Sequence, residues 1–399
     1  MAGEICNTSA RRHRAGILAL AVLAVNAAAC TPRRVDPPTF EPQTWPAHLL
    51  ERHHAPSADA YVGDSIEVRW TRDVGKSSAG PLALGDSIIV ATSADRRVTV
   101  LRRDDGAVVW QHRLKGVGTT GALFTQSRVY AASGDTEGQV QSWDLLTGKH
   151  RWNTKVGPVT RPLALREGTL YAATAAGAVT ALGIDRGTER WWRPFRKPVR
   201  SGVTIAGDRV FVASEDSLYL LRPADGSVET VVPSPGVVTQ PPALAGTTMV
   251  IVSPDRFIVG LDAATLAIRW RIDVDDPIFG GVAIARDTAF AVTVAGDLWR
   301  VPLAAPTAAS RLVLDRTVRA SPAPVRNGVL VGTVGGDILF VDGRSGGPRW
   351  SRKVDDPIEF PPLVDRGTIY VYDGRGTIHA WAIVPADGGG LAAGRRGTR

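Results

Sequence analysis

The sequence predicts an all-β fold, an eight-bladed β-propeller of four-stranded antiparallel blades, from a repeated unit and two evenly spaced residue columns. The unit recurs about every 40 residues. In its clearest copy, residues 318–350, three short apolar and β-branched runs are separated by Asn-Gly and Gly-Gly, and a fourth run ends near Trp350. Such two-residue turns join antiparallel strands, and a period near 40 with four strands is typical of a propeller blade.

Two sets of residues, each at one fixed position of the repeat and called columns here, give the number of blades. One is formed by tryptophans 40, 42, 40, 78 and 80 residues apart, so each long interval spans two blades with one tryptophan missing. Its members are Trp70, Trp110, Trp152, Trp192, Trp270 and Trp350. The other column precedes each second strand at intervals of 39 to 41 residues and consists of Pro81, Gly121, Pro162, Gly202, Pro242, Gly281, Pro322 and Pro361. Its eight members predict eight blades.

The two ends of the chain are expected to complete one blade together. The last copy of the unit supplies three strands from Ile358 onward and ends without a closing tryptophan. The segment 65–74 has the pattern of a fourth strand but has no first three strands before it. We expect it to pair with residues 377–382, which would close the ring and remove exposed sheet edges. The propeller is therefore predicted over residues 65–384.

Residues 1–29 have the pattern of a lipoprotein signal peptide. In residues 1–29, a segment with three arginines precedes an apolar run, residues 16–25, that is too short to span a bilayer. The run leads into Ala-Ala-Ala-Cys, which resembles the bacterial lipobox, and this implies lipid attachment at Cys30. Because Thr31 rather than Asp follows, the resemblance also implies the outer membrane. The alternative is an ordinary secretory signal that leaves Cys30 as a free thiol.

The remaining segments and the charge limit the partners. Residues 30–64 are rich in proline and are expected to form an extended tether, and residues 385–399 a disordered basic tail. The formal charge of +8 falls to +6 without residues 1–29, which contain three Arg and one Glu. No basic stripe with aromatics is visible, so we expect no nucleic-acid partner. Because the sequence contains only Cys6 and Cys30, no disulfide is expected once the signal is removed.

The blade pattern in residues 138–152, GQVQSWDLLTGKHRW, resembles the PQQ-type repeat of the quinoprotein alcohol dehydrogenases. The resemblance extends over nearly all of residues 65–383. It implies that the column tryptophans are structural and lie between blades, with each indole N–H bonded to a main-chain acceptor. Enzymes of this superfamily bind PQQ and Ca²⁺ through converging oxygen ligands and carry a vicinal Cys-Cys pair. This sequence has no such pair, and Glu359 is the one carboxylate within two residues before the Pro/Gly column. We therefore nominate no catalytic, cofactor-binding or metal-binding residue.

A lipobox, a tether and a compact ring of such repeats together resemble the BamB family of outer-membrane lipoproteins. The resemblance implies a non-catalytic, periplasm-facing scaffold with a monomeric ring, which binds the barrel-forming subunit of the β-barrel assembly machinery. It implies a contact through an arginine on the connection entering a mid-ring blade, which Arg200 matches, and through two acids on the next connection. Gly236 and Val238 stand at those acidic positions. Two alternatives stay open: a quinoprotein-like enzyme or sensor of the cell envelope, and an envelope lipoprotein that binds peptides or glycans.

Further charged residues on the connections between blades are candidates for partner binding. Asp275-Asp276 and Asp355-Asp356 recur in identical Asp-Asp-Pro-Ile segments two blades apart. They are candidate acidic patches for a basic partner, although turn formation explains Asp and Pro equally well. Three arginines lie within three residues of the Pro/Gly column and are candidates for a basic rim at one mouth of the ring: Arg161, Arg200 and Arg319.

Overall fold

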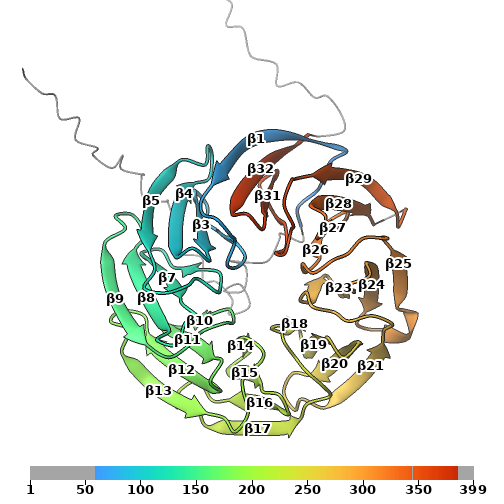
Figure 1. The fold of residues 1–399 in the computed structure, drawn as a ribbon. Helices are drawn as coiled ribbons and strands as arrows, with labels where there is room; N and C mark the ends of the chain where they lie inside the picture. Colours follow the sequence, from blue (N-terminus) through green and yellow to red (C-terminus); the bar gives the residue numbers. More distant parts are fainter. Residues whose placement is uncertain (1–58, 344, 385–399) are drawn as a thin grey trace, which may run out of the picture. The chain divides into compact units, whose positions relative to one another are not determined.

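The protein is a ring of eight four-stranded antiparallel sheets, as the sequence predicts (Figure 1). The computed structural model describes residues 59–343 and 345–384. Within these residues the helical structure is one short 3₁₀ turn, η2 (Pro306–Ala308), in the insertion before the last strand of the sixth blade. The prediction of an all-β, eight-bladed propeller is therefore confirmed.

The first four blades follow one another along the chain. Blade 1 consists of β2 (Ala83–Leu84), β3 (Ile88–Ser93), β4 (Arg97–Arg102) and β5 (Val108–Arg113). Blade 2 consists of β6 (Leu123–Phe124), β7 (Arg128–Ala132), β8 (Gln139–Asp144) and β9 (His150–Lys155). Blade 3 consists of β10 (Ala164–Arg166), β11 (Thr169–Thr174), β12 (Ala178–Gly183) and β13 (Glu189–Pro194). Blade 4 consists of β14 (Thr204–Ala206), β15 (Arg209–Ala213), β16 (Ser217–Leu221) and β17 (Val228–Pro233).

The last four blades include one that contains both ends of the propeller. Blade 5 consists of β18 (Ala243–Ala245), β19 (Thr248–Ser253), β20 (Phe257–Asp262) and β21 (Ile268–Asp273). Blade 6 consists of β22 (Ala283–Ala285), β23 (Thr288–Val292), β24 (Asp297–Pro302) and β25 (Ser310–Val313). Blade 7 consists of β26 (Ala323–Val325), β27 (Gly328–Gly332), β28 (Asp337–Asp342) and β29 (Pro348–Lys353). Blade 8 consists of β30 (Leu363–Asp365), β31 (Thr368–Tyr372), β32 (Thr377–Val384) and, outermost, β1 (Ser65–Asp73), which pairs antiparallel with β32.

The hydrophobic core lies between the blades. Every residue of β3 and β11, both second strands, is buried, whereas Trp110 is the one buried residue of the outermost strand β5. The second and third strands are buried on both faces because a blade on each side covers them. Their near-continuous apolar sequences reflect this environment, since a strand covered on both faces does not need alternating polar residues.

Tryptophans connect five of the eight outermost strands to the following part of the ring. In each case the indole Nε1–H donates to a main-chain carbonyl beyond its own blade: Trp70 to Arg103 (3.0 Å), Trp110 to Leu145 (2.8 Å), Trp152 to Ile184 (2.9 Å), Trp191 to Pro223 (2.7 Å) and Trp350 to Gly63 (3.0 Å). These hydrogen bonds satisfy the polar edge of a ring whose body is buried. Trp270 lies at the matching register in blade 5, opposite Gly260, and packs partly buried against blade 6.

The assignment of Trp192 to this column is wrong. Trp191 pairs with Ala181 beside the strand bulge, as Trp110 pairs with Val100, and its side chain is 8% exposed. Trp192 is 54% exposed. Successive side chains of a strand point to opposite faces, so a one-residue error in register moves the side chain from the core to solvent.

The indole rings depend on glycine in the turn of the following blade. A Cβ atom at Gly106, Gly148, Gly187 or Gly226 would lie 2.4–2.9 Å from atoms of the preceding blade's tryptophan. All four glycines have positive φ. Glycine is therefore required both by the turn and by the close approach of the indole ring.

Between blades 4 and 5 the tryptophan–glycine pair is replaced by a threonine and a leucine. Blade 4 has Thr230 at the tryptophan position, paired with Leu220, and blade 5 has Leu266 at the glycine position. Leu266 has φ +60°, is 1% exposed and packs with Leu220 in the core between the two blades. The leucine fills the space that the missing indole leaves, even though its backbone conformation is unfavourable for a side chain with a Cβ.

The packed part of the chain begins ahead of residue 65, the predicted boundary of the propeller. The side chain of Asn327 in the β26–β27 turn bonds both main-chain groups of Val62, and Arg349 forms an ion pair with Asp64. Val62 is fully buried, and Gly63 supplies the acceptor for Trp350. The outermost strand of blade 8, β1, comes from the N-terminal side of the described residues, and Gly63 just before it accepts this indole.

A buried arginine links blade 8 to blade 1. Arg103 donates through Nε to the Tyr370 hydroxyl at 2.9 Å and through Nη1 to Asp365 Oδ2 at 2.6 Å. The Arg103 carbonyl accepts the indole N–H of Trp70. One residue therefore bonds both the outermost strand and the inner strands of blade 8.

The exchange between Thr230 and Leu266 predicts strong coupling between the two positions. Thr230→Trp alone should destabilise by about 1–3 kcal/mol because the indole would overlap Leu266. Leu266→Gly alone should destabilise by about 2–5 kcal/mol through the cavity it leaves. The double variant should lie within about 1 kcal/mol of the wild type, as measured by a double-mutant cycle in urea. Simple addition of the two single effects would contradict this pairing.

The turn carboxylates predict loss of stability in acid. Burial alone would raise the pKa of Asp144, but hydrogen bonds from Arg151 and Thr147 outweigh it and lower the pKa to about 2. Since the pKa is depressed in the folded state, the stabilisation is present above pH 3.8 and is lost as the pH falls towards 2. The urea midpoint should fall over this range, less steeply in Asp144→Asn. Asp104→Asn, at an exposed position of the neighbouring blade, should leave the slope unchanged.

Candidate functional site

Two sets of loops form one face of the ring, which we call the connection face. One set joins each outermost strand to the next blade, and the other joins the second and third strands of that next blade. Main-chain hydrogen bonds tie the two sets together in seven blades: Ala94 to Ser77, Gly134 to Val117, Ala175 to Pro158, Glu215 to Pro198, Val294 to Pro277, Val334 to Thr317 and Gly374 to Pro357. In these seven blades the loop pair is therefore held on its blade.

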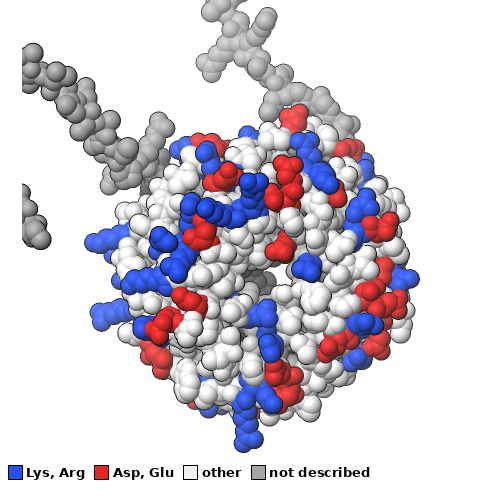
Figure 2. Space-filling view, in the orientation of Figure 1, with Lys and Arg blue, Asp and Glu red and all other residues white. Residues whose placement is uncertain are grey.

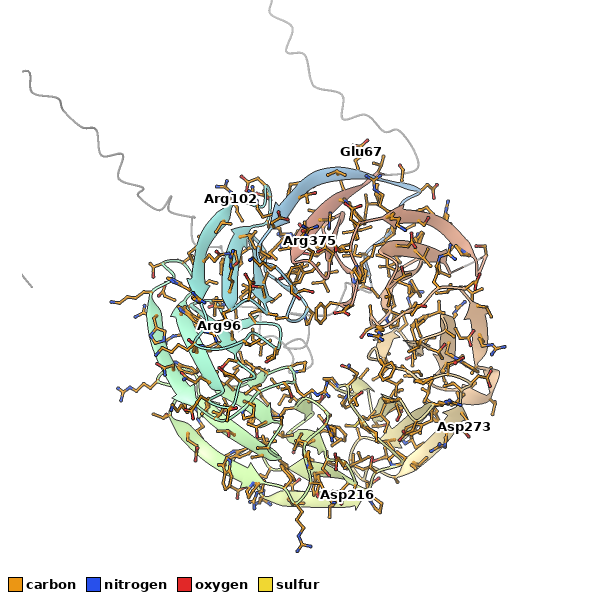
Figure 3. All side chains as sticks on the ribbon, viewed as in Figure 1. Glu67, Arg96, Arg102, Asp216, Asp273 and Arg375 are labelled. Carbon is orange, nitrogen blue, oxygen red and sulfur yellow. The ribbon has the colours of Figure 1, made fainter. Side chains whose placement is uncertain are left out.

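Charged residues of both signs occupy this face. Figure 3 labels Arg96, Asp216 and Arg375, which come from the second-to-third-strand turns of blades 1, 4 and 8. Figure 2 shows acidic and basic side chains around the hollow at the centre of the ring. All the partner-binding residues predicted from the sequence lie on the connections of this face.

A central cavity of about 530 Å³ is lined by the innermost strands and the connections before them. Two of the three arginines predicted to form a basic rim, Arg161 and Arg319, line it. Glu359 also lines it, whereas Arg200 does not. The structure thus brings two of the rim arginines to the cavity and leaves the third outside its lining.

Arg200 forms an ion pair within its own blade. Its Nε donates to Glu215 Oε1 at 2.9 Å, and its Nη2 bonds the same oxygen. Glu215 lies in the turn between β15 and β16, so sequence reasoning about the connections alone did not identify it. Both side chains are partly exposed, which leaves the pair open to a further charged group.

The next connection has a carboxylate from a different source. Val238, at one of the two positions expected to be acidic, is fully buried in the core between blades 4 and 5. The Val237 N–H donates to Asp255 Oδ2 at 2.7 Å, and Asp255 is an exposed residue of the β19–β20 turn. The acidic group on blade 5 is therefore supplied by a turn, not by the connection, and the sequence spacing did not indicate this.

The two Asp-Asp segments lie on separate connections, before blades 6 and 8. Asp275 accepts a hydrogen bond from Arg311 Nη1 at 2.8 Å and is otherwise exposed. The connection between the two segments, which enters blade 7, contains Arg319. Asp276 and Asp356 are half-buried, and Asp355 is exposed. The structure therefore does not join the two segments into one acidic patch.

The cavity lining offers little to a metal ion. The described residues contain no group of three or more His, Cys, Asp or Glu side chains that could hold a metal, and the one carboxylate of the lining is Glu359. The donors that a Ca²⁺–quinone group requires are therefore not assembled in this part of the chain. In the same residues, no helical segment has the length and apolar character of a membrane span. The predicted lipid-attachment residue Cys30 and the predicted tail 385–399 lie outside the described residues.

Comparison with known proteins identifies relatives of this ring. The family model described as "Outer membrane protein assembly factor BamB" matches residues 60–161, 136–231 and 295–389, which together make up more than half of the chain. The BamB protein of Escherichia coli strain K12 is 26% identical over 272 residues, 60% of this chain and 68% of that protein. BamB of Salmonella typhimurium is 27% identical over 251 residues, 56% of this chain and 62% of that protein.

Solved structures of several kinds share the fold. The crystal structure of BamB from Moraxella catarrhalis has a TM-score of 0.68 at 14% identity and covers 80% of this chain and all of its own. A quinohemoprotein alcohol dehydrogenase from Pseudomonas putida HK5 has a TM-score of 0.69 at 10% identity, covering 84% of this chain and 79% of its own. These similarities show the fold alone. The family match is specific, and the chain belongs to the family of the outer membrane protein assembly factor BamB.

Proposed function

We propose that the protein is a non-catalytic, protein-binding scaffold with a BamB-like role in the assembly of outer-membrane β-barrel proteins. The observation that carries this proposal is the family match over the propeller. The curated relatives that share 26–27% identity with the chain are named as outer-membrane assembly factors. The proposed partner is the barrel-forming subunit of the assembly machinery.

The surface proposed to bind this partner is the part of the connection face on blades 4 to 6. It combines the Arg200–Glu215 pair, the Asp255 carboxylate and Phe279, whose side chain is 45% exposed. Aromatic and arginine side chains are common among the energetically dominant contacts of protein interfaces. Backbone bonds hold the connections of blades 4 and 6, and the Val237 N–H holds the Asp255 carboxylate, so little conformational entropy is lost on binding.

The scaffold is proposed to be an outer-membrane lipoprotein that faces the periplasm and is anchored through Cys30. The motif before Cys30 and the envelope function named for the relatives support this location. A short tether would leave the propeller close to the membrane in which its partner resides. Acyl chains stabilise such an anchor by about 0.8 kcal/mol per buried CH₂ group.

Reversal of the charge at Arg200 tests the proposed contact. The lipidated protein is purified by affinity from detergent-solubilised envelopes, and the barrel-forming subunit is quantified in the eluate. We expect Arg200→Glu to reduce its recovery at least tenfold, because the partner's acidic group would meet a second carboxylate. Phe279→Ala should reduce recovery several-fold through loss of apolar contact.

The matched control is the swapped pair Arg200→Glu with Glu215→Arg. It restores the ion pair inside blade 4 but leaves the reversed charge at residue 200, so recovery should stay low. Full recovery with the swapped pair would show that Arg200→Glu acts only through repulsion from Glu215. Absence of the subunit from the wild-type eluate would refute the proposed partner, and dehydrogenase activity with PQQ and Ca²⁺ would favour the quinoprotein alternative.

Removal of the lipid-attachment residue tests the anchor. Cys30→Ser should move the protein from the membrane fraction to the soluble fraction and abolish incorporation of a labelled fatty acid. Cys6→Ser is the control, since this residue lies in the segment expected to be removed. A Cys30→Ser protein that remained lipidated and membrane-bound would contradict the proposal.

A further inference from the structure

Arg161 differs from the residues at the same position in every other connection. The position directly before the Pro/Gly column is occupied elsewhere by uncharged residues: Gly80, Thr120, Ser201, Pro241, Gly280, Ser321 and Phe360. Arg161 lines the central cavity and is half-buried. A guanidinium group is therefore placed where the repeat itself requires no charge.

No counter-ion compensates this charge within the described residues. Arg161 forms no ion pair or hydrogen bond there, and its pKa is lowered by burial and by repulsion from Arg200. A partly desolvated cation without a partner is costly. The Arg161 guanidinium group therefore destabilises the fold and has no ion pair or hydrogen bond among the described residues to offset this, which is typical of a group that binds a ligand.

Two further groups of the lining point to the same use. Arg319, on the connection to blade 7, lies across the ring from blade 3 and also forms no ion pair among the described residues (Figure 1). Thr204 in β14, which follows Arg161 by one blade, lines the cavity with a buried hydroxyl that has no hydrogen-bond partner. Buried hydroxyls are nearly always bonded in folded proteins, so this one has an unused donor and acceptor.

The size and charge of the cavity limit the ligand. Its volume of about 530 Å³ lies within the range of small-molecule sites. Its charged lining consists of Arg161, Arg319 and Glu359, with a net charge of +1. Arginine binds carboxylates through two parallel hydrogen bonds. A ligand with two carboxylates offers one such acceptor to each arginine.

We propose that Arg161, Arg319 and Thr204 form a binding site for a dicarboxylate inside the central cavity, separate from the protein-binding surface on the connection face. The carboxylates belong either to a free small acid or to two acidic side chains of a peptide segment that enters the cavity. The site goes beyond the scaffold role, and either could be absent without the other.

Calorimetry on the full chain in detergent tests the site with three probes. These are succinate, a short blocked peptide with two glutamates, and sulfate. One of the two carboxylate probes should bind with a dissociation constant below about 10 mM and should raise the melting temperature, whereas sulfate should bind at least tenfold more weakly. The tighter of the two carboxylate probes identifies the source of the ligand.

Variants separate a binding role from a structural one. Arg161→Gln should weaken binding at least tenfold and leave the melting temperature unchanged or higher, because it removes an uncompensated charge. Thr204→Val should weaken binding about fivefold, the effect of one neutral hydrogen bond. Thr180→Val is the matched control, since the Thr180 hydroxyl is also buried without a partner but lies outside the cavity lining.

Arg316→Gln, on the same connection as Arg319 but outside the lining, should not alter binding. Recovery of the protein partner should be unaffected by Arg161→Gln, which distinguishes this site from the proposed scaffold surface. The proposal is overturned if neither carboxylate probe binds, if sulfate binds equally well, or if Arg161→Gln lowers the melting temperature and leaves binding intact.

Discussion

The indole ring between one blade and the turn of the next is the contact on which this ring depends. Each such tryptophan fills the widening gap between two sheets and bonds its N–H to a carbonyl of the neighbouring part of the chain. The turn glycines exist because no Cβ fits beneath the indole. Where blade 4 lacks the indole, Leu266 occupies the space in a left-handed conformation, so the volume between blades is conserved although the residues are not.

Rigid blades suit the connection face to the binding role proposed for it. Since main-chain bonds hold seven of the eight connections against a turn of their blade, charged and aromatic side chains there are displayed in fixed positions. Two kinds of site are proposed on this arrangement. Arg200 and Phe279 are exposed and accessible to a protein surface, whereas Arg161 and Arg319 line the central cavity.

The sites could be predicted from the sequence only in part. The positions of Arg161, Arg200 and Arg319 on the connections followed from the Pro/Gly column, because the repeat fixes where each connection ends. Their partners did not follow. Glu215 and Asp255 reach the connections from second-to-third-strand turns, and Thr204 is significant because its hydroxyl is left unbonded. Such contacts depend on how loops distant by 15 or more residues fold towards each other.

The amino-acid sequence by itself determined the number of blades, the strand pattern and the family, because the same apolar runs and turn residues recur eight times with a period near 40. The structure decided which of two adjacent tryptophans enters the core, since Trp191 and Trp192 differ only in the face of the strand they occupy. It also decided that residues 60–64 join the ring, where Gly63 accepts the indole of Trp350. The period of the repeat determines where the strands and turns of each blade lie. Where a residue departs from the repeat, its position depends on the space that neighbouring side chains leave in the folded ring.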